Sequence, residues 1–257
     1  MLLTFDIGNT NTVIGLFDND KLIEHWRFAT DRTRTADELR LTTRGLFTET
    51  GLSPDRVRGV AVASVVPSLN QPLRNGLQRM ISGEIEFLTC ETSPIELRVD
   101  DPWSVGADRI ANSIAAYSSY GGPILAIDFG TATTFDLVSE DGAFLGGAIA
   151  PEMNLAARGL TDRAAQLPSV SLTVPSSVIG KTTADNIRAG VVLGFMDLID
   201  GLIRRFHAAC PGHLRVLATG GKGELFYHQL DAIELYDPFL TLAGLQQWWQ
   251  RSDRSSR

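Results

Sequence analysis

The sequence predicts an α/β fold in which one pattern of strands and helices occurs twice. Short apolar runs of strand length alternate with helical patterns, in the order βββαβαβα, first over the start of the chain and then again after it. Each half also begins with a hairpin in which an aspartate precedes glycine and small polar residues, Asp6-Ile-Gly-Asn-Thr and Asp128-Phe-Gly-Thr-Ala-Thr. We therefore predict two similar domains, 1–120 and 121–257.

The first half opens with three strands, because Gly, Asn and Asp turn signals separate three apolar segments: LLTFDI, TVIGLF and KLIEHWRF. Thr35 and Glu38 then form a capping box, and Gly51 is suited to end the helix that they begin. The remaining elements of this half are a buried strand in VRGVAVASVV, a helix over about 69–81, a strand in IEFLTC and a helix that begins near Ala107.

The second half repeats this order. The run ILAIDFGTATTFDLVSEDGAFLGGAIAP contains three strands, with Asp141-Gly142 as the turn between the second and the third. The elements that follow are helices over about 152–160 and 183–209, the strand LRVLATG, a short helix, the strand IELY and a last helix in LTLAGLQQWWQ. The helix from Thr183 is apolar over more than one stripe, so we expect two buried sides, one of them at a subunit interface.

Composition excludes several classes of function. The net charge of -7, with no dense Lys/Arg block, repels phosphate backbones, so nucleic acid is not an expected partner. No segment approaches the roughly 20 apolar residues of a membrane span, and the first residues lack the basic start of a signal peptide. We expect a cytoplasmic protein without a membrane partner. Cys90 and Cys210 are too few for a disulfide framework.

The two hairpins are suited to bind a polyphosphate. Glycine at positions 8 and 130 leaves backbone amides open to phosphate, and the carboxylates of Asp6 and Asp128 can hold the accompanying cations. If the two domains face each other, a polyphosphate and its cation can be held between the hairpins. Either hairpin alone is equally consistent with an ordinary turn closed by an Asx bond. Their equivalent positions in the two halves favour a function.

A third glycine turn follows a late strand in LATGG. Gly220 and Gly221 allow an adenine ring or a ribose to lie against bare backbone, although this segment alone is only a strand-to-helix turn. Two rival phosphate motifs fail. Gly180-Lys181-Thr182 resembles the end of a Walker A loop, but position 175 is proline, and no G-x-G-x-x-G follows a strand.

The segment GADR is a candidate for the chemistry, because it places Gly106, Asp108 and Arg109 at the start of a helix. The carboxylate can accept a proton, and the guanidinium can bind an anion at the positive end of the helix dipole. From this segment alone, a helix-capping Asp108 with a surface Arg109 is slightly favoured. The cleft expected between the hairpins favours the catalytic interpretation.

An ordered set of motifs resembles the type III pantothenate kinases over nearly the whole chain: DIGNTNT, GADR, IDFGTATTFD, GGAIAP, Leu167-Pro168, IGKTT, ATGG and DPFLTLAGL. The resemblance implies duplicated ribonuclease H-like (actin-like ATPase) domains facing across a nucleotide cleft. It also implies ATP-dependent phosphorylation of pantothenate to 4'-phosphopantothenate, the first step of coenzyme A biosynthesis.

The resemblance further implies roles for individual residues. Asp108 is the general base, Asp6 assists Mg²⁺, and Asp128 binds a monovalent cation, K⁺ or NH₄⁺. The implied pantothenate contacts are Val99, Gly106, Arg109 and Thr183, with Thr183 reaching the site from the partner subunit of a homodimer. The implied nucleotide contacts are Asp6, Gly8, Asn9, Thr10, Asn11, Gly130, Thr131, Thr133, Gly220 and Gly221.

Two positions depart from the family pattern. Val99 stands where the family usually has a tyrosine, and Glu152 stands where it has a glycine. Glu152 either places a charge near the substrate or starts the following helix. Both positions bear on the acceptor more than on the nucleotide, so a kinase for another small hydroxy acid is one alternative. A nucleotide-binding regulatory protein without turnover is another, although it has no chemical need for the base Asp108.

Overall fold

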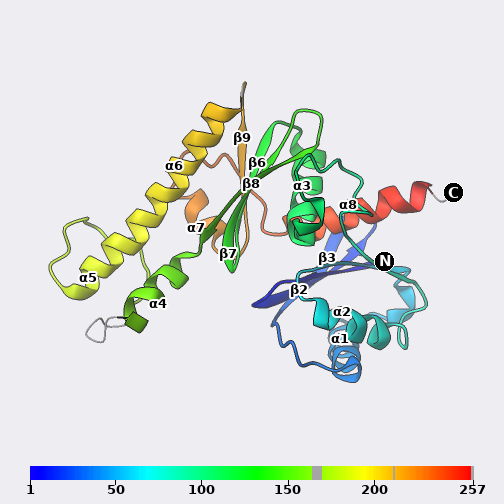
Figure 1. Ribbon diagram of the computed structural model, residues 1–257. Coiled ribbons are helices and arrows are strands. Elements are labelled where there is room, and N and C mark those ends of the chain that lie inside the picture. Colours follow the sequence, from blue (N-terminus) through cyan, green and yellow to red (C-terminus); the bar gives the residue numbers. More distant parts are fainter. Residues whose placement is uncertain (164–169, 211, 256–257) are drawn as a thin grey trace. The chain divides into compact units, whose positions relative to one another are not determined.

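The computed structural model describes residues 1–163, 170–210 and 212–255, so the motif Leu167-Pro168 lies outside the described residues. The chain forms two compact units. Unit 1 combines Met1–Gly121, Gly142–Gly146 and Phe239–Arg257, and unit 2 combines Gly122–Asp141 and Gly147–Pro238 (Figure 1).

The sheet of unit 1 has five strands in the order β3-β2-β1-β4-β5. The strands are β1 (Leu2–Ile7), β2 (Asn11–Asp18), β3 (Lys21–Ala29), β4 (Gly59–Ser64) and β5 (Glu84–Phe87). β1 is antiparallel to β2 and parallel to β4. Because β1 and β4 are central strands, both of their faces are covered, which accounts for their continuous apolar sequences.

The helices of unit 1 are α1 (Ala36–Thr50), α2 (Pro67–Leu77), α3 (Ala107–Tyr120) and α8 (Leu240–Ser255), with 3₁₀ turns at Pro54–Arg56 and Pro102–Ser104. The predicted capping box is confirmed, since the Thr35 hydroxyl accepts from the Glu38 amide and the Glu38 carboxylate accepts from the Thr35 amide. Gly51, at φ 69°, ends α1 as predicted. α2 begins earlier than predicted because Pro67 suits the first turn of a helix.

The helices cover the two faces of the first sheet. One buried cluster combines the inward side chains of β1 with α1 and α2, and includes Phe5, Phe47 and Leu73. The other combines β4 with α3 and α8, and includes Ile110 and Trp248. Unit 1 is therefore a three-layer α/β/α structure whose second helical layer comes from distant parts of the chain.

The last helix, α8, packs into unit 1, although it ends the second repeat of the sequence pattern. The indole N–H of Trp248 donates to the Thr92 carbonyl at 2.9 Å, and the Thr241 hydroxyl donates to Asn112 Oδ1 at 2.8 Å. The predicted division into 1–120 and 121–257, which follows the repeated pattern, does not coincide with these packing units.

The sheet of unit 2 has the order β10-β9-β6-β7-β8, which is the same topology as the first sheet written from the other edge. Its strands are β6 (Ile124–Phe129), β7 (Ala132–Val138), β8 (Phe144–Pro151), β9 (Arg215–Thr219) and β10 (Leu235–Tyr236). β6 is antiparallel to β7 and parallel to β9, as β1 is to β2 and β4. The predicted duplication is therefore confirmed at the level of topology.

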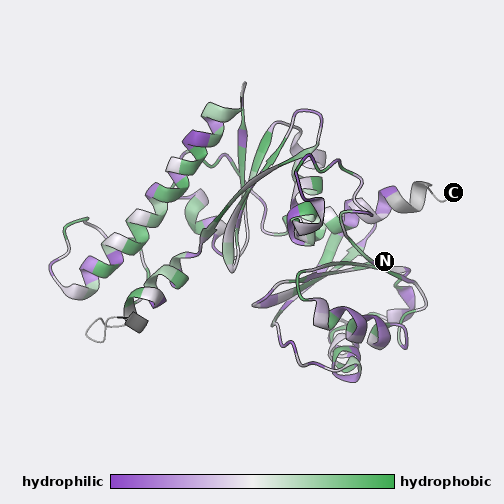
Figure 2. Cartoon of the chain, viewed as in Figure 1, coloured by the Kyte–Doolittle hydropathy of each residue, from purple (hydrophilic) through white to green (hydrophobic). Residues whose placement is uncertain are grey.

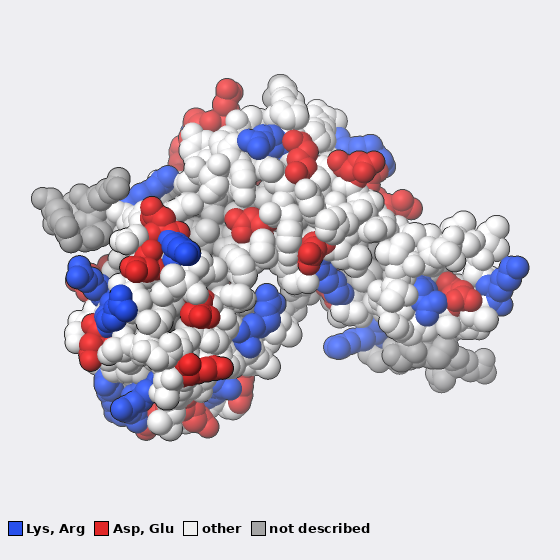
Figure 3. Space-filling view, turned by 180° about the vertical axis from the view of Figure 1, so that it is seen from behind, with Lys and Arg blue, Asp and Glu red and all other residues white. Residues whose placement is uncertain are grey.

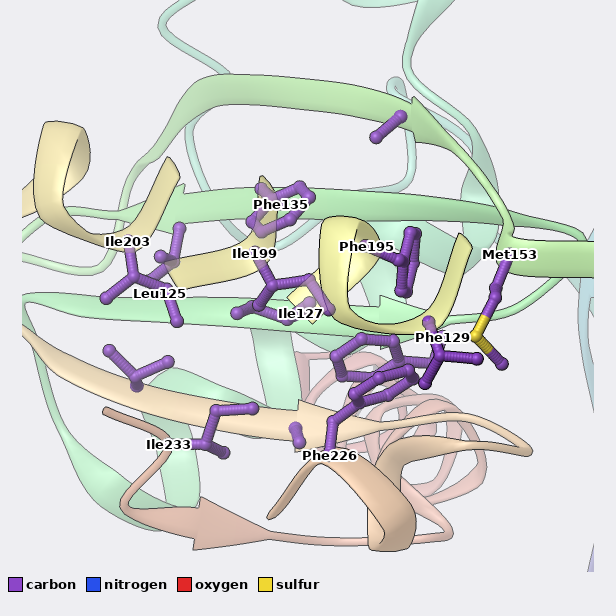
Figure 4. Packing of buried hydrophobic residues seen from close by; sticks show 14 of the residues in the cluster. Leu125, Ile127, Phe129, Phe135, Met153, Phe195, Ile199, Ile203, Phe226 and Ile233 are labelled. Carbon is purple, nitrogen blue, oxygen red and sulfur yellow. The ribbon is translucent and has the colours of Figure 1, made fainter. Parts of the chain in front are cut away.

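The helices of unit 2 are α4 (Met153–Arg163), α5 (Thr183–Arg188), α6 (Gly194–Ala209) and α7 (Gly223–Tyr227), with a π-helical turn at Ala189–Leu193. The helix predicted over 183–209 is thus interrupted by that turn. Figure 2 shows hydrophobic and hydrophilic residues alternating along α6, and its apolar face buries Phe195, Ile199 and Ile203. These side chains pack on Leu125, Ile127 and Phe135 of the sheet (Figure 4).

Charged side chains are distributed over the surface of the molecule. Basic and acidic side chains are interspersed on the face seen in Figure 3. In the described ranges, no helix combines the length and the hydropathy that a membrane span requires.

Candidate functional site

The β1–β2 hairpin presents an open polar turn. Asp6 lies near the end of β1, opposite Val13 and Ala63 on the neighbouring strands, and is half-buried. The Gly8 amide donates to the Asn11 carbonyl at 3.0 Å and closes the turn. Asn9, Thr10 and Asn11 are exposed, so the predicted phosphate-binding residues lie at the surface, just beyond a carboxylate.

The segment after β3 holds this turn in place. The Thr30 hydroxyl donates to the Gly8 carbonyl at 2.7 Å, and the Thr30 amide donates to the Thr10 carbonyl at 2.8 Å. Arg32 Nη2 donates to Asn9 Oδ1 at 2.8 Å. The sequence reasoning missed Arg32, because no spacing signal links two residues that are 23 positions apart. A guanidinium thus lies at the tip of the predicted phosphate-binding turn.

Gly106, the N-cap of α3, leaves space for the carboxylate of Asp108. A Cβ at position 106 would lie 2.5 Å from Asp108 Oδ1 and 3.4 Å from Val65 Cγ1. The Arg109 amide donates to the same Asp108 oxygen at 2.8 Å, which fixes the carboxylate at the start of the helix. A side chain at position 106 would therefore have to displace the Asp108 carboxylate.

The environment of Asp108 makes it a stronger base than an aspartate in water. Burial of the carboxyl group raises the pKa of Asp108, and this effect outweighs the lowering by the Arg109 amide and guanidinium. A raised pKa brings a proton acceptor closer to neutral pH, where it transfers protons more effectively. Asp108 thus combines a fixed position with increased basicity.

Arg109 lies over an aromatic ring of the same unit. Its Cζ is 5.3 Å from the centroid of the buried Phe144 ring, which is the geometry of a cation–π contact. The Phe144 backbone is bonded to the segment before α3, from the Phe144 amide to the Glu96 carbonyl and from the Arg98 amide to the Phe144 carbonyl, each at 2.9 Å. The Arg109 guanidinium therefore lies against an aromatic ring whose backbone is held by hydrogen bonds.

Val99 follows this segment and lies beside a glycine of β8. A Cβ at Gly146, which has φ 99°, would lie 3.6 Å from Val99 Cγ1. Val99 packs on the cluster that includes Ile110 of α3, so it belongs to the same neighbourhood as Asp108 and Arg109. The structure thus places all the predicted acceptor-site residues of unit 1 around the start of α3.

Val65 connects the start of α3 with the phosphate hairpin. Its amide donates to the carbonyl of Ile7, the residue after Asp6, at 3.0 Å. Its Cγ1 would lie 3.4 Å from a Cβ at Gly106. Because β4 is parallel to β1, Val65 and Ile7 lie at the same edge of the sheet. The predicted base and the first predicted phosphate-binding turn are therefore neighbours within one unit.

The β6–β7 hairpin of unit 2 has the same form, with one buried residue among its predicted contacts. Gly130 and Thr131 are exposed at its tip, and Asp128 lies opposite Thr134. Thr133 is fully buried opposite Phe129, and its hydroxyl has no hydrogen-bond partner within the described ranges. Its side chain faces the covered side of the sheet because alternate residues of a strand face opposite sides, so the hydroxyl does not lie at the exposed tip, and the place of Thr133 in the phosphate loop stays a prediction.

The turn after β9 lies against the end of β6. Gly220 has φ 86°, and a Cβ there would lie 2.4 Å from Asp128 Oδ1 and 2.8 Å from the Phe129 amide nitrogen. Only glycine fits this position. The structure thus brings together a predicted adenosine-binding glycine and the predicted cation-binding carboxylate, with Gly221 exposed beside them.

Thr183 belongs to unit 2, whereas the other predicted acceptor-site residues belong to unit 1, and it lines a groove of about 660 Å³. The groove is mainly apolar and is lined by Pro151, Ala156, Leu160, Thr183, Asn186, Ile187, Gly190, Val191, Gly194, Phe195 and Leu198. Thr183 and Asn186 supply its polar groups. Gly190 and Gly194 have open space at the Cβ position, so the helical wall is flat there.

Glu152 starts the helix that follows β8. Its carboxylate accepts from the Asn154 amide at 2.8 Å and forms an ion pair with Lys222, and its carbonyl accepts from the Leu155 amide. The residue is 9% exposed. Of the two roles left open for Glu152, the structure supports helix capping.

The hairpin carboxylates could hold cations only together with other ligands. In the described part of the chain, no three His, Cys, Asp or Glu side chains form a group that could hold a metal ion. Mg²⁺ bound with a nucleotide typically uses one or two carboxylates and the phosphates, so Asp6 at an open turn fits this ligand set.

Comparisons with known proteins show what the chain as a whole is similar to. A family model described as type III pantothenate kinase matches residues 2–205. A type III pantothenate kinase of Roseiflexus sp. (strain RS-1) is 44% identical and covers 96% of this chain and 97% of its own length. One from Moorella thermoacetica is 44% identical over 98% of this chain and 100% of its own. The ROK hexokinase of Thermus thermophilus shares the fold, with a TM-score of 0.53, 13% identity and coverage of 98% and 99% of the two chains.

Proposed function

Because the chain belongs to the type III pantothenate kinases, which phosphorylate pantothenate with ATP in coenzyme A biosynthesis, we propose roles for its site residues in that reaction. The single observation that carries the proposal is the position of Asp108. This carboxylate has a raised pKa and lies, through Val65, beside the turn that follows Asp6.

Asp108 is the general base. The primary hydroxyl of pantothenate attacks the γ-phosphorus of ATP, the bond to the β-phosphate oxygen breaks, ADP leaves, and the hydroxyl proton passes to the Asp108 carboxylate. Arg109 binds the pantothenate carboxylate, because a guanidinium matches that group in charge and in geometry. Gly106, Val99 and Thr183 surround the acceptor.

The glycine turns bind the nucleotide. The backbone groups of Gly8, Asn9, Thr10 and Asn11 contact phosphates, as do Gly130 and Thr131 of the second hairpin, and Gly220 and Gly221 contact the adenosine. Asp6 assists Mg²⁺, which neutralises phosphate charge when it is bound. Asp128 holds the monovalent cation, K⁺ or NH₄⁺. This role is supported by the position of the Asp128 carboxylate beside Gly220. A Cβ at position 220 would lie 2.4 Å from Asp128 Oδ1, so only glycine fits next to this carboxylate.

An ADP-release assay tests this proposal. With Mg-ATP, we expect turnover that requires pantothenate and that is faster in K⁺ or NH₄⁺ than in Na⁺ at equal ionic strength. The assay also separates the alternatives. ATP binding without pantothenate-dependent ADP release indicates a regulatory protein, and turnover that responds to a different hydroxy acid indicates another acceptor. Equal rates in K⁺ and Na⁺ would contradict the role of Asp128.

The groove beside Thr183 is proposed as the homodimer interface. Exposed apolar side chains of unit 2 adjoin the groove-lining elements in the sequence, including Ile149 at 64%, Leu155 at 57%, Val178 at 71% and Ile179 at 76% exposed. A second copy covers this surface, and the partner's Thr183 then completes the acceptor site.

Gly190→Trp is expected to give a monomer with a raised KM for pantothenate. The position has no atom within 4 Å of a Cβ, so the chain tolerates the side chain while the groove is filled. Size-exclusion chromatography with light scattering measures the mass. Gly45→Trp, at an equally open helical glycine of unit 1, is the control. A Gly190→Trp protein that stays dimeric would place the interface elsewhere.

A further inference from the structure

A partly buried ion pair ties the glycine turn after β9 to the start of α4. Both carboxylate oxygens of Glu152 are engaged, Oε2 by the Asn154 amide at 2.8 Å and Oε1 by Asn154 Nδ2 at 3.1 Å and by Lys222 Nζ. The side chain of Glu152 is 12% exposed and that of Lys222 is 29% exposed. Because the Glu152 carboxylate is largely shielded from water, removal of Lys222 would leave this carboxylate without its counter-charge in a shielded position.

Lys222 comes directly after the two glycines of the turn. The Gly223 amide donates to the Gly220 carbonyl at 3.1 Å, so Lys222 lies inside the hydrogen-bonded turn that leads into α7. On its other side the turn packs closely, since Gly220 lies against Asp128 and the backbone of Phe129. The turn is therefore held at two points, the end of β6 and the Glu152 carboxylate.

Apolar packing between the end of β6, α7 and the start of α4 supports the same arrangement. Phe129 of β6 stacks on Phe226 of α7, with ring centroids 4.6 Å apart, and Met153 is 1% exposed. Figure 4 shows the Met153 side chain beside Phe129 and above Phe226. The first residue of α4, which follows Glu152 directly, thus packs in the same cluster as Phe129 and Phe226.

From these contacts we propose that Glu152 and Lys222 are positioning residues for the nucleotide. Their ion pair holds the backbone of Gly220 and Gly221 in the conformation that receives the adenosine part of ATP. The inference rests on the proposed assignment of this turn to the nucleotide. It assigns Lys222 no direct contact with the nucleotide and no part in the phosphoryl transfer.

The test is a double-mutant cycle read by nucleotide binding. Calorimetry measures the Kd of Mg-ADP for the wild type, Glu152→Gln, Lys222→Met and the double variant. Each single change is expected to raise the Kd about five- to tenfold, and the double variant no more than either single one, because both remove the same pair. Gln keeps an acceptor oxygen for the Asn154 amide, so the cap of α4 is retained. Lys222→Arg is expected to bind like the wild type.

Steady-state kinetics supply a second readout. The KM for ATP is expected to rise in parallel with the Kd, with kcat and the KM for pantothenate within about twofold of the wild type, because the pair acts on the nucleotide turn alone. Lys21→Met, at an exposed lysine of unit 1, is the matched control. If Lys222→Met fails to fold, Lys222→Gln replaces it in the cycle.

Three results would overturn the inference. Lower melting temperatures with an unchanged Kd would make the pair purely structural. Weaker binding in Lys222→Met but not in Glu152→Gln would make Lys222 a direct contact. Absence of Mg-ADP binding by the wild type would exclude the assignment of this turn to the nucleotide. Failure of the proposed function is distinct, because it shows as absent pantothenate-dependent turnover while Mg-ADP still binds.

Discussion

Asp108→Asn lowers the pantothenate-dependent kcat by about 10²-fold or more, with little change in the Kd of Mg-ATP. The amide keeps the shape of the carboxyl group and an oxygen for the Arg109 amide, but it cannot accept the hydroxyl proton. Since the carboxylate is the group whose pKa the fold raises, its loss removes a tuned base. Single-turnover and steady-state ADP release measure the effect.

The control for this variant is Asp101→Asn, at an exposed aspartate of the same segment, which is expected to retain activity. In the wild type, kcat/KM should decrease as the pH is lowered, because protonation removes the base. The midpoint of this decrease should lie above about pH 4, the usual pKa of an aspartate, because the pKa of Asp108 is raised. Near-normal turnover in Asp108→Asn would exclude this residue as the base.

The same variant is expected to unfold at a higher temperature than the wild type at neutral pH. A carboxyl group whose pKa is higher in the folded than in the unfolded state binds protons more tightly when folded, so the wild type loses stability as the pH rises between the two values. Asparagine carries no such cost. The difference in melting temperature should therefore shrink as the pH falls toward about 4.

Gly244→Ala lowers the free energy of unfolding by about 3 kcal/mol, the upper end of what overpacking usually costs. A Cβ at this position of α8 would lie 1.9 Å from the carbonyl oxygen of Ala111 in α3 and 2.6 Å from its carbonyl carbon. Backbone atoms cannot move aside as a side chain does, so the two helices must separate. The melting temperature should fall by roughly 6–12 °C for a chain of this size.

Gly45→Ala is the matched control, since Gly45 is also inside a helix and a Cβ there meets nothing within 4 Å. It is expected to stabilise the protein by about 0.5–1 kcal/mol, because alanine favours the helix. Thermal unfolding of both variants separates the intrinsic helix preference from the contact between α3 and α8. Equal melting temperatures would mean that α8 does not pack closely on α3.

The order of elements could be predicted from the sequence, because the signals for it are local. Apolar runs of strand length, the capping box at Thr35 and Glu38 and the turn at Gly142 depend only on neighbouring residues. The paired glycine hairpins likewise follow from local signals, and their phosphate-binding role stays a prediction. The burial of the Thr133 side chain could not be predicted, because the side that it faces depends on the register of the strand with Phe129, which short motifs do not specify.

Contacts between distant segments could not be predicted. The pairs formed by Arg32 with Asn9 and by Glu152 with Lys222 join segments far apart in the chain, and a single charged residue carries no signal for its partner. The role of Gly106 in making space for Asp108 depends on a side-chain rotamer. The apolar pattern of α8 showed that it is a helix with a buried face, but not which sheet it covers.

The place of α8 in unit 1 also has a consequence for the order in which the chain folds during synthesis. Leu242, Leu245 and Trp248 complete the cluster around Ile110, yet the ribosome makes them after almost the whole of unit 2. Domains generally fold as they emerge, with the N-terminal one first. Here the N-terminal unit can complete its core only after unit 2 has been synthesised, so the face of its sheet that α3 begins to cover gains its last helix at the end of synthesis.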